Sequence, residues 1–454
     1  MEKLCALIVA SLIFGPPFVT RATALRSRDG LEEWGYVEVR PKAHMFWWLY
    51  RSPNREKNAS KPWPIILWLQ GGPGASGAGY GNFEEIGPLD VNLKPRDSTW
   101  LRIADLLFVD NPVGTGFSFV EHPKLLAKTD EEAATDLTTL LIKIFKKNKS
   151  HRKSHLYIVG ESYGGKFVVT LGLSALKAIE AGKLRLKLGG VALGNSWISP
   201  EDFVLSWGPL LKDVSRLDDY GLRRSNSIAR KIKRQLQDGQ FFNATNSWLD
   251  LEGEISYSSY GVSMYNFLLD EEDSGVLSGI EARSPQRTVR KRYSSYLKAL
   301  WSSTGGGGDV GSLLNGAVRR KLEIIPENVT WQLLADPVTH RFDGDFMKPR
   351  IDEVDELLAK GVHVTVFNGQ LDVICATKGV EAWIRKLKWE GLPKFLGKER
   401  ELLTGRCGSD KNISKGFLKS HKNLHFYWIL GAGHMVPKDQ PCMGLIVASA
   451  ITHP

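Results

Sequence analysis

Short apolar runs of β-forming residues alternate with stretches of helical periodicity along much of the chain. This alternation constrains the fold more than any other feature, because parallel strands are joined by helices that cover the sheet. Several runs are apolar at consecutive positions, which is typical of strands buried on both faces. The sequence therefore predicts an α/β fold with a mainly parallel central sheet flanked by helices. The six strand-like runs begin at Pro64, Asp105, His155, Leu188, Val362 and Leu424.

Two helices are predicted between these strands. The residues Thr129-Asp130-Glu131-Glu132 form a capping box, which marks a helix N-terminus. Apolar residues follow it at helical spacing, and core packing explains that face fully. A second helix is predicted from about Gly165 to Ile179.

The strand rhythm is interrupted between residues 201 and 350. A chain of 454 residues exceeds the roughly 250 to 300 residues at which one core stops growing, so an insertion or a second domain is expected. Because strand patterns resume at Val362, we interpret 201–350 as a mainly helical insertion or cap. The core is then divided into residues 25–200 and 351–454. The glycines 305–308 follow no strand and precede no Lys-Ser/Thr pair, so they predict a flexible loop rather than a phosphate loop.

Residues 1–24 have the layout of a secretory signal peptide. Lys3 precedes an apolar run over residues 4–14, prolines follow, and residues 22–24 match a small-residue cleavage site. The run is too short to cross a hydrocarbon core of about 30 Å, which disfavours a membrane anchor. We therefore expect a secreted protein that is free of the membrane after signal removal. Five Asn-x-Ser/Thr sequons support this route as glycosylation sites, at Asn58, Asn148, Asn243, Asn328 and Asn412.

The charge and cysteine content exclude several function classes. The net charge of +10 is spread over many short basic clusters, which indicates a solvated basic surface rather than a nucleic-acid site. Cys5 leaves with the signal, so an odd number of cysteines remains and at least one thiol is unpaired or pairs outside the chain. The histidines form no zinc-binding pattern, and neither a metal nor a cofactor is expected.

The stretch "VGESYGGK" places Ser162 between two glycines. A bare Gly-x-Ser-x-Gly is a weak signal, but this one follows a predicted strand and opens a predicted helix. That is the setting of a nucleophile elbow. Gly160 and Gly164 supply the clearance that so tight a turn needs.

A serine hydroxyl needs a base to take its proton and a carboxylate to orient that base. In sheet hydrolases the order along the chain is Ser, then Asp or Glu, then His. Asp372 and His434 follow the last two predicted strands in that order. Each alone is equally explained as a loop residue. Together with Ser162, at strand ends where open sheets place their ligands, they predict a catalytic triad.

Acyl transfer also needs donors for the developing oxyanion. After the strand that begins at Pro64 comes the turn Gly71-Gly72-Pro73-Gly74, whose backbone N–H groups can point into the site. One donor would come from this turn and the other from Tyr163, the residue after the nucleophile. Structural need for a tight turn is the alternative explanation of the glycines.

Six ordered motifs resemble the serine carboxypeptidases, including the retinoid-inducible and plant serine carboxypeptidase-like group. The motifs are "WLQGGPGASG", "NFEEIGP", "DNPVGTGFSF", "VGESYGGK", "NGQLDVICAT" and "GAGHMVPKDQP". The resemblance implies an α/β-hydrolase fold with a helical insertion. It implies cleavage of single residues from peptide C-termini at acidic pH, in a secreted, vacuolar or lysosomal setting. The catalytic roles carry over to Ser162, Asp372 and His434, and the oxyanion donors to Gly72 and Tyr163.

The resemblance also implies how the terminal carboxylate of the substrate is held. The family uses an asparagine before the double glycine, a glutamate beside the nucleophile and a second glutamate that supports the first. The matching positions are Gln70, Glu161 and Glu85, beside Gly71. Two carboxyls held close share a proton, which leaves a donor for the substrate.

Three further positions in the family motifs differ or have special roles. Gln70 is one methylene longer than the usual asparagine. Met435 is expected to line the pocket of the leaving residue, and core packing would explain it equally well. Cys375 matches a thiol that some members keep near the site.

Two alternatives to the peptidase stay open from the sequence. Plant members of the family use the same triad to pass an acyl group to an alcohol, so an acyltransferase is the second hypothesis. A catalytically silent binding homologue is the third, although no triad member is missing. Peptide or protein C-termini are the expected partners, and the sequence leaves a homodimer open.

Overall fold

The computed structural model of the chain describes residues 24–55, 62–147, 153–270, 309–404 and 414–453. Within these ranges a twelve-stranded sheet runs through the molecule in the order β1-β2-β3-β5-β4-β7-β8-β9-β12-β11-β10, and β6 pairs with β3. The fold is an α/β hydrolase with a mainly parallel centre. The signal segment, the glycines 305–308 and the sequons at Asn58, Asn148 and Asn412 lie outside the described residues.

The parallel centre consists of the six strands that the sequence predicts, and each lies where its apolar run indicates. Neighbouring strands of this centre pair in parallel from β5 to β12. Their bounds are β4 (Ile65–Leu69), β5 (Asp105–Val109), β7 (His155–Glu161), β8 (Lys187–Gly194), β9 (His363–Gly369) and β12 (Leu424–Ile429).

Antiparallel strands extend the sheet on both sides of this centre. The strands β2 and β3 pair over most of their length, and β3 also pairs with β5 on its other side. At the other edge β11 pairs with β12 and β10 pairs with β11. The sequence analysis did not find these strands. Their bounds are β1 (Leu25–Arg26), β2 (Glu32–Arg40), β3 (Ala43–Tyr50), β6 (Phe119–Val120), β10 (Glu401–Thr404) and β11 (Ser414–His421).

Alternate residues of the central strands bury opposite faces of the sheet. In β4, Ile65, Leu67 and Leu69 belong to one hydrophobic cluster, while Ile66 and Trp68 belong to the other. Side chains of successive strand residues point to opposite faces, so a strand that is apolar throughout serves two cores. This pattern explains why the central runs lack the polar alternation of a half-exposed strand.

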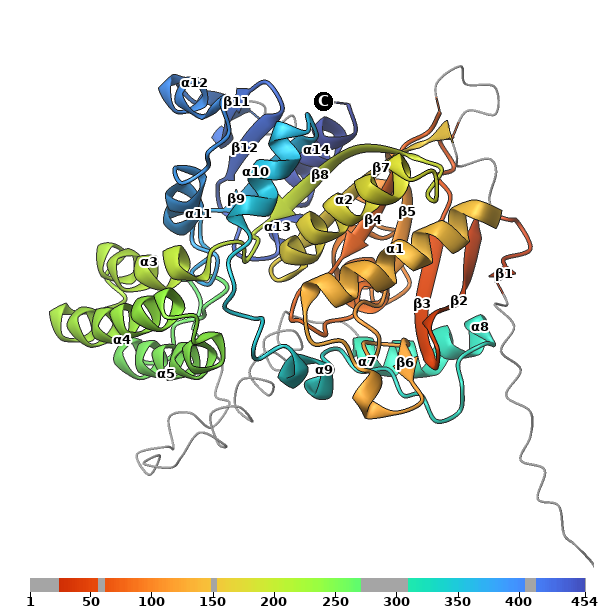
Figure 1. Cartoon of the computed structure of the whole chain (residues 1–454), viewed down its shortest axis with the longest axis horizontal. Coiled ribbons are helices and arrows are strands. Elements are labelled where there is room, and N and C mark those ends of the chain that lie inside the picture. The colour runs from red at the N-terminus through yellow and green to blue at the C-terminus, as the bar shows by residue number, and fades with distance from the viewer. Residues whose placement is uncertain (1–23, 56–61, 148–152, 271–308, 405–413, 454) are drawn as a thin grey trace, which may run out of the picture.

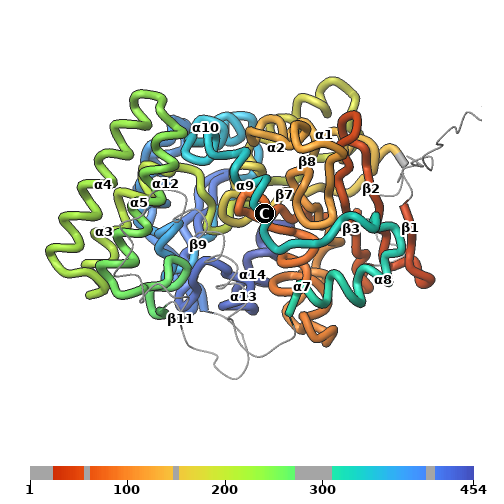
Figure 2. The backbone as a smooth tube through the Cα atoms, turned by 90° about the horizontal axis from the view of Figure 1, so that it is seen from below, coloured from red at the N-terminus to blue at the C-terminus, as the bar shows by residue number. Residues whose placement is uncertain are grey.

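Helices cover both faces (Figure 2). The first core includes α1 (Asp130–Lys147), α2 (Gly164–Glu180) and α10 (Ile351–Ala359), and the second includes α14 (Pro441–Thr452). Further helices are η1 (Gly77–Ile86), η2 (Trp100–Arg102), η3 (Pro123–Leu125), α11 (Thr377–Ile384), α12 (Leu392–Gly397) and α13 (Val436–Asp439).

The predicted cap of α1 is present in part. The Glu132 N–H donates to the Thr129 hydroxyl at 3.2 Å, as a capping box requires. The return bond differs, because the Glu132 carboxylate accepts from the N–H of Lys128 instead of Thr129. The helix therefore begins where the sequence indicates, with its second bond shifted by one residue.

Helices fill most of the described chain between β8 and β9. Three of them lie together at one end of the molecule, far from β1 and β2 (Figure 1). They are α3 (Pro200–Asp213), α4 (Asp219–Gln237) and α5 (Phe241–Ser259). Four shorter helical segments follow, which are α7 (Val310–Leu313), η6 (Leu314–Val318), α8 (Arg319–Leu322) and α9 (Asp336–Arg341). The division of the chain at residues 200 and 350 stays a proposal.

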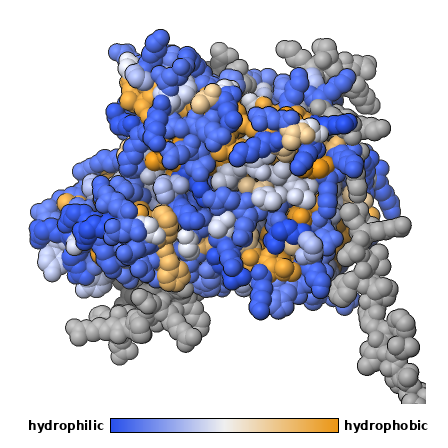
Figure 3. Space-filling model, viewed as in Figure 1, coloured by the Kyte–Doolittle hydropathy of each residue, from blue (hydrophilic) through white to orange (hydrophobic). Residues whose placement is uncertain are grey.

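The surface is mainly polar. Apolar residues form only small patches on the face shown in Figure 3, between charged and polar side chains. Among the residues that the structure describes, no helix combines the length and the apolar character that a bilayer span requires.

Candidate active site

Ser162 lies on a strained turn between β7 and α2. Its φ angle is +61°, a left-handed conformation that a residue with a side chain seldom adopts. The flanking glycines are required by space: a methyl group at Gly164 would lie 2.2 Å from the Leu69 carbonyl oxygen, and one at Gly160 would lie 2.7 Å from the Gly164 oxygen. Ser162 is partly exposed, whereas Glu161 and Tyr163 are buried. The turn thus leaves the serine partly exposed at the carboxyl end of the buried strand β7.

Asp372 and His434 follow the carboxyl ends of β9 and β12, and the structure brings them together. His434 Nδ1 lies 2.8 Å from Asp372 Oδ2, and both side chains are buried. The parallel pairing of Gly369 with Ile429 aligns the two strand ends and places their loops side by side. An aspartate on Nδ1 leaves Nε2 as the nitrogen that can take a proton from a nucleophile.

Asn195 holds Asp372 in place. At the end of β8, its amide group donates to Asp372 Oδ2 at 2.6 Å and to the Gly433 carbonyl at 3.4 Å. The other carboxylate oxygen of Asp372 accepts the Cys375 N–H at 3.2 Å. Both oxygens of Asp372 are therefore directed by donors, which fixes the plane of the carboxylate.

His434 Nε2 is buried and makes no hydrogen bond within the described residues. The Ser162–His434 hydrogen bond is thus not formed in this structure. Such bonds are often long in unliganded sites and tighten with substrate, so the triad stays a prediction. Tyr265 restrains His434 in two ways: its ring packs edge-on against the imidazole at 4.7 Å between centroids, and its backbone carbonyl accepts the backbone N–H of His434 at 2.8 Å.

The two predicted oxyanion donors lie on adjoining backbone loops. A methyl group at Gly71 would lie 2.6 Å from Ser162 Cβ and 2.9 Å from the Tyr163 nitrogen, so the two loops are in contact. Gly72 has a φ of +107°, which favours glycine at this position. Neither the Gly72 N–H nor the Tyr163 N–H donates to another group in the described part of the chain.

Gln70, Glu161 and Glu85 form a buried polar cluster beside the nucleophile. The Gln70 amide donates to Glu161 Oε1 at 2.9 Å, so the longer side chain reaches its predicted partner. The indole N–H of Trp68 donates to Gln70 Oε1 at 2.7 Å, which orients the amide with its NH₂ group toward Glu161. Gly81 leaves room for this pair, because a methyl group there would lie 2.2 Å from the Trp68 indole nitrogen.

Burial favours the protonated forms of the two glutamates. Burial raises the pKa of Glu85 to about 7. Burial, and next the charge of Glu85, raise the pKa of Glu161 well above its ordinary value. Glu161 Oε2 and both oxygens of Glu85 accept no hydrogen bond from the described residues.

Three contributors were not found from the sequence. Asn195 follows a predicted strand, so its place at the carboxyl end of β8 was an available signal. Trp68 lies in an apolar strand, where the sequence does not distinguish an indole that orients Gln70 from an ordinary core residue. Tyr265 lies in the predicted insertion, with no local pattern to connect it to His434.

Two clusters in the described chain have the donor set of a metal site. Ligand atoms of Asp372, Cys375 and His434 lie within 4.8 Å of one another, as do those of Asp130, Glu131 and Asp345. Hydrogen bonding within the predicted triad explains the first cluster. The carboxylates of the second already pair with the cation of Arg350.

The remaining predicted positions have ordinary surroundings. Cys375 is a free buried thiol, and burial raises its pKa well above the usual value, while Cys442 is disulfide-bonded. Met435 is buried directly beside His434 in sequence. Asn243 and Asn328 are exposed, as glycosylation requires, and their modification stays a proposal.

The comparisons with known proteins identify the family of the chain. A family model for serine carboxypeptidases matches residues 26–453. "Serine carboxypeptidase-like 51" from Arabidopsis thaliana is 58% identical over 93% of this chain and 92% of its own length. "Retinoid-inducible serine carboxypeptidase" from Mus musculus is 46% identical over 94% of this chain and 92% of its own.

A solved structure shares the fold. It is Kex1(delta)p, a prohormone-processing carboxypeptidase from Saccharomyces cerevisiae, with a TM-score of 0.76 and 21% identity. The match covers 93% of this chain and 91% of the yeast chain.

Fold and site together define a serine hydrolase of the α/β-hydrolase class. More narrowly, the chain belongs to the serine carboxypeptidase family. It is thus a serine-type carboxypeptidase by family, and neither the acyltransferase nor the silent binding homologue is favoured.

The bond from Asn195 to Asp372 makes a first prediction. Asn195→Ala removes a donor from a buried carboxylate, so we expect kcat to fall roughly tenfold because His434 is less well oriented. We expect KM to change little and unfolding to become easier by about 1–3 kcal/mol. Steady-state kinetics and thermal unfolding measure both effects.

Asn423→Ala is the matched control. Its amide braces the Leu358 and Val362 carbonyls at 3.0 and 2.8 Å, at the opposite end of the strands. It should lower stability and leave kcat unchanged. A wild-type kcat in Asn195→Ala would remove Asn195 from the positioning of Asp372.

Proposed function

We propose that the protein releases single residues from the C-termini of peptides through an acyl-enzyme on Ser162. The observation that carries this proposal is the pair of buried acids, Glu85 and Glu161, of which Glu161 adjoins Ser162 in sequence and burial raises the pKa of both. A site for a neutral ester needs no such acid group. A group that binds a terminal carboxylate does, because an anion buried against two carboxylates would be repelled.

The residues divide the chemistry between them. Ser162 Oγ attacks the scissile carbonyl carbon while His434 Nε2 takes the hydroxyl proton, and the Asp372 carboxylate stabilises the imidazolium. The oxyanion that forms is held by the Gly72 and Tyr163 N–H groups. The tetrahedral intermediate then breaks the C–N bond, and the proton on Nε2 passes to the leaving amine. Water, activated by the same imidazole, releases the shortened peptide from Ser162.

The leaving residue is recognised by its own carboxylate. The Gln70 NH₂ group and the protonated member of the glutamate pair supply donors, with the Gly71 backbone beside them. Met435, buried next to His434, is proposed to line the pocket of the leaving side chain. This arrangement restricts cleavage to the last residue, because only that residue carries a free carboxylate.

The proposal predicts a substrate-dependent effect at Glu161. We expect Glu161→Ala to lower kcat/KM for a peptide with a free C-terminus about tenfold to hundredfold, because it removes a charge-assisted donor. Hydrolysis of a neutral ester should fall much less. Peptide pools with free and with amidated C-termini, read by mass spectrometry, test the activity, with Ser162→Ala as the inactive control. Equal losses on peptide and ester would remove Glu161 from carboxylate recognition.

Peptide cleavage should also depend on pH. We expect the best turnover at roughly pH 4 to 6, because the pair must keep its proton. As the pH rises through the Glu85 pKa of about 7, Glu85 ionises and its negative charge repels the substrate carboxylate, so KM should rise. The neutral ester serves as the internal control, since it has no carboxylate to repel. A peptide profile that stays flat up to pH 8 would contradict the role of the pair.

The same pair affects stability in a defined direction. The folded pKa of Glu85 lies above its ordinary value of 4.5, so the native state holds a proton that the unfolded chain has released. The contribution of Glu85 to stability is therefore fully present below about pH 4.5 and is lost as the pH rises through about 7. Glu85→Gln cannot ionise, so its unfolding free energy should decline less over this window, measured by denaturant titration at pH 5 and 8.

We further propose that the protein follows the secretory route. The layout of residues 1–24 and the exposure of Asn243 and Asn328 support this proposal. Protein from a eukaryotic host should start after residue 24 and lose mass on treatment with an endoglycosidase that removes Asn-linked sugars. N-terminal sequencing and mass spectrometry measure both. An uncleaved N-terminus would contradict the route.

A further inference from the structure

One segment contacts both of the backbone loops that carry the oxyanion donors. It is the chain that leads back to the sheet before α10, Leu333–Arg350, and is called the brace below. Its first half lies against the Gly71–Gly74 turn and its second half against Tyr163. The two halves are described in turn.

The first half of the brace is hydrogen-bonded along the turn that contains Gly72. The Ser76 N–H donates to the Leu333 carbonyl at 3.1 Å, and the Ala335 N–H donates to the Gly74 carbonyl at 2.9 Å. The Thr339 hydroxyl donates to the Pro73 carbonyl at 2.8 Å. Two bonds to the residues before α9 and one from within α9 therefore hold the loop from one side.

Packing leaves this loop little freedom. A methyl group at Gly72 would lie 3.1 Å from a Leu334 methyl carbon, and one at Gly74 would lie 3.1 Å from the Ala335 carbonyl oxygen. Both are closer than most real side-chain contacts. The peptide plane that carries the Gly72 N–H is thus set against the brace as well as against its own turn.

The second half of the brace grips the residue that follows the nucleophile. The Tyr163 hydroxyl donates to Asp345 Oδ2 at 2.5 Å. Lys166, in the first turn of α2, donates to the Asp345 backbone carbonyl at 2.7 Å and to Asp345 Oδ2 at 3.3 Å. The Tyr163 ring also stacks on Phe346, with 5.7 Å between centroids and 6° between planes. Both the polar tip and the ring face of Tyr163 are therefore held by the brace.

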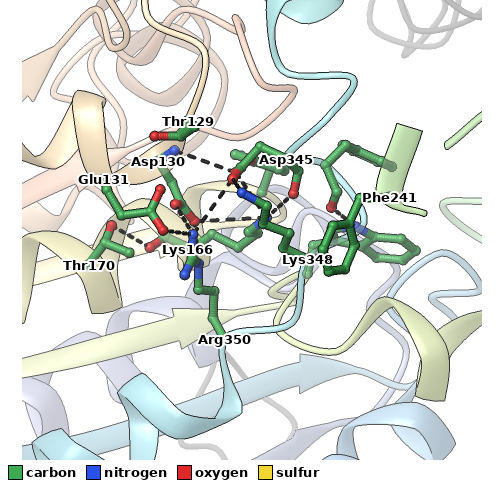
Figure 4. Close-up of polar contacts among 12 residues, drawn as sticks. Thr129, Asp130, Glu131, Lys166, Thr170, Phe241, Asp345, Lys348 and Arg350 are labelled. Atoms are coloured by element: carbon green, nitrogen blue, oxygen red, sulfur yellow. Dashed lines mark hydrogen bonds and ion pairs between the residues drawn. The ribbon is translucent and has the colours of Figure 1, made fainter. Parts of the chain in front are cut away.

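A buried ionic network anchors Asp345 itself (Figure 4). Lys166, Asp130 and Asp345 are fully buried, and Arg350 nearly so. Arg350 Nε donates to Asp130 Oδ2 at 2.7 Å, and Lys166 Nζ lies 3.8 Å from the same oxygen. The network joins α1, the start of α2 and the end of the brace. Breaking one of its ion pairs would leave an unpaired buried charge, which is strongly destabilising.

The two acids of the network are not equivalent. Burial raises the pKa of Asp130 to about 7. Burial acts on Asp345 in the same direction, but the Lys166 charge and the Tyr163 hydroxyl outweigh it and hold the pKa of Asp345 below its ordinary value. Asp345 is the carboxylate that accepts from Tyr163 and Lys166 together, so it is the acid that links the network to the elbow.

We propose that the brace positions both amide donors of the oxyanion hole, with Thr339 and Asp345 as its positioning residues. The inference rests on the proposed function in one respect, that the Gly72 and Tyr163 N–H groups stabilise the oxyanion. Thr339 and Asp345 do not contact the reacting atoms. These two residues act by fixing the direction of the Gly72 and Tyr163 N–H groups, which bond to nothing else among the described residues. A donor aimed about 1 Å away from the oxyanion loses most of its effect.

Two variants and two controls test this proposal. Asp345→Asn weakens the bond from Tyr163, because a neutral amide oxygen is a poorer acceptor than a carboxylate, and Thr339→Val removes the bond to the Pro73 carbonyl. Both variants keep nearly the same side-chain shape. Asp136→Asn and Thr138→Val are the matched controls in α1. Asp136 is a buried acid whose Oδ1 pairs with Arg40 at 2.7 Å, and the Thr138 hydroxyl donates to the Ala134 carbonyl at 2.8 Å. Neither control residue contacts the donor loops through these bonds.

The measurements separate oxyanion stabilisation from folding. The rate at which a fluorophosphonate labels Ser162 reads the nucleophile and the oxyanion hole without a peptide. We expect roughly tenfold to hundredfold slower labelling for Asp345→Asn, and a smaller loss for Thr339→Val. For a peptide substrate, kcat should fall by the same factor while KM stays within about twofold. The controls should lower the unfolding temperature as much and keep wild-type labelling rates.

A double-mutant cycle tests the direct link to Tyr163. Tyr163→Phe removes the same hydrogen bond from the other side and keeps the ring stacked on Phe346. If the bond carries the effect, Tyr163→Phe combined with Asp345→Asn should be no slower than the slower of the two single variants. Fully additive losses would contradict the link. Tyr163→Phe and Thr339→Val also keep the proposal testable if Asp345→Asn does not fold.

The outcomes distinguish the inference from the function on which it rests. If the wild-type protein labels with the probe but releases no C-terminal residue, the peptidase proposal fails, and the labelling rates still decide the role of the brace. If Asp345→Asn and Thr339→Val unfold as easily as their controls but label at the wild-type rate, the brace is purely structural and the inference is wrong.

Discussion

The structure depends first on a backbone turn that is strained and tightly confined. Ser162 can adopt a positive φ only because the residues around it leave no other path between β7 and α2. Gly164 lies against the Leu69 carbonyl so closely that no side chain fits between them. Strain of this kind persists where the surrounding structure over-determines the conformation. Here the sheet, the following helix and the brace supply that constraint, and the serine side chain is presented outward as a result.

The site places buried charge in two different ways. At Glu161 and Glu85 two acids lie together with no cation bonded to either among the described residues, and burial raises their pKa values until a proton is retained. Asp345, by contrast, forms an ion pair with Lys166, and this pairing helps hold its pKa below the ordinary value, which favours the charged form. The first arrangement places two acids beside the nucleophile, and the proposed carboxylate recognition rests on it. The second joins α1, α2 and the brace through ion pairs.

Local patterns predicted the central fold well, for a physical reason. A strand buried on both faces must be apolar at every position, and a nucleophile elbow must follow such a strand with small residues at fixed offsets. Both requirements concern residues that are close together in the sequence, as His155–Glu161 and Gly164 are. The antiparallel edge strands were missed, and so were Asn195, Trp68 and Tyr265. The edge strands pair with near neighbours in sequence, as β2 does with β3, so distance along the chain does not explain their omission. Asn195 and Tyr265 do depend on distant partners, Asp372 and His434. The partner of Trp68, Gln70, is close, but the indole resembles an ordinary core residue.

The sequence by itself determined the parallel sheet, the order of the three predicted catalytic residues and the family. Each of these follows from residue type and spacing over short distances. Only the tertiary structure decided that Asn195 fixes Asp372, that the indole of Trp68 orients Gln70 and that Leu333–Arg350 lies against both donor loops. Contacts between distant segments depend on how the chain closes in space. No run of neighbouring residues specifies that closure, because many sequences satisfy the same local pattern while meeting different partners.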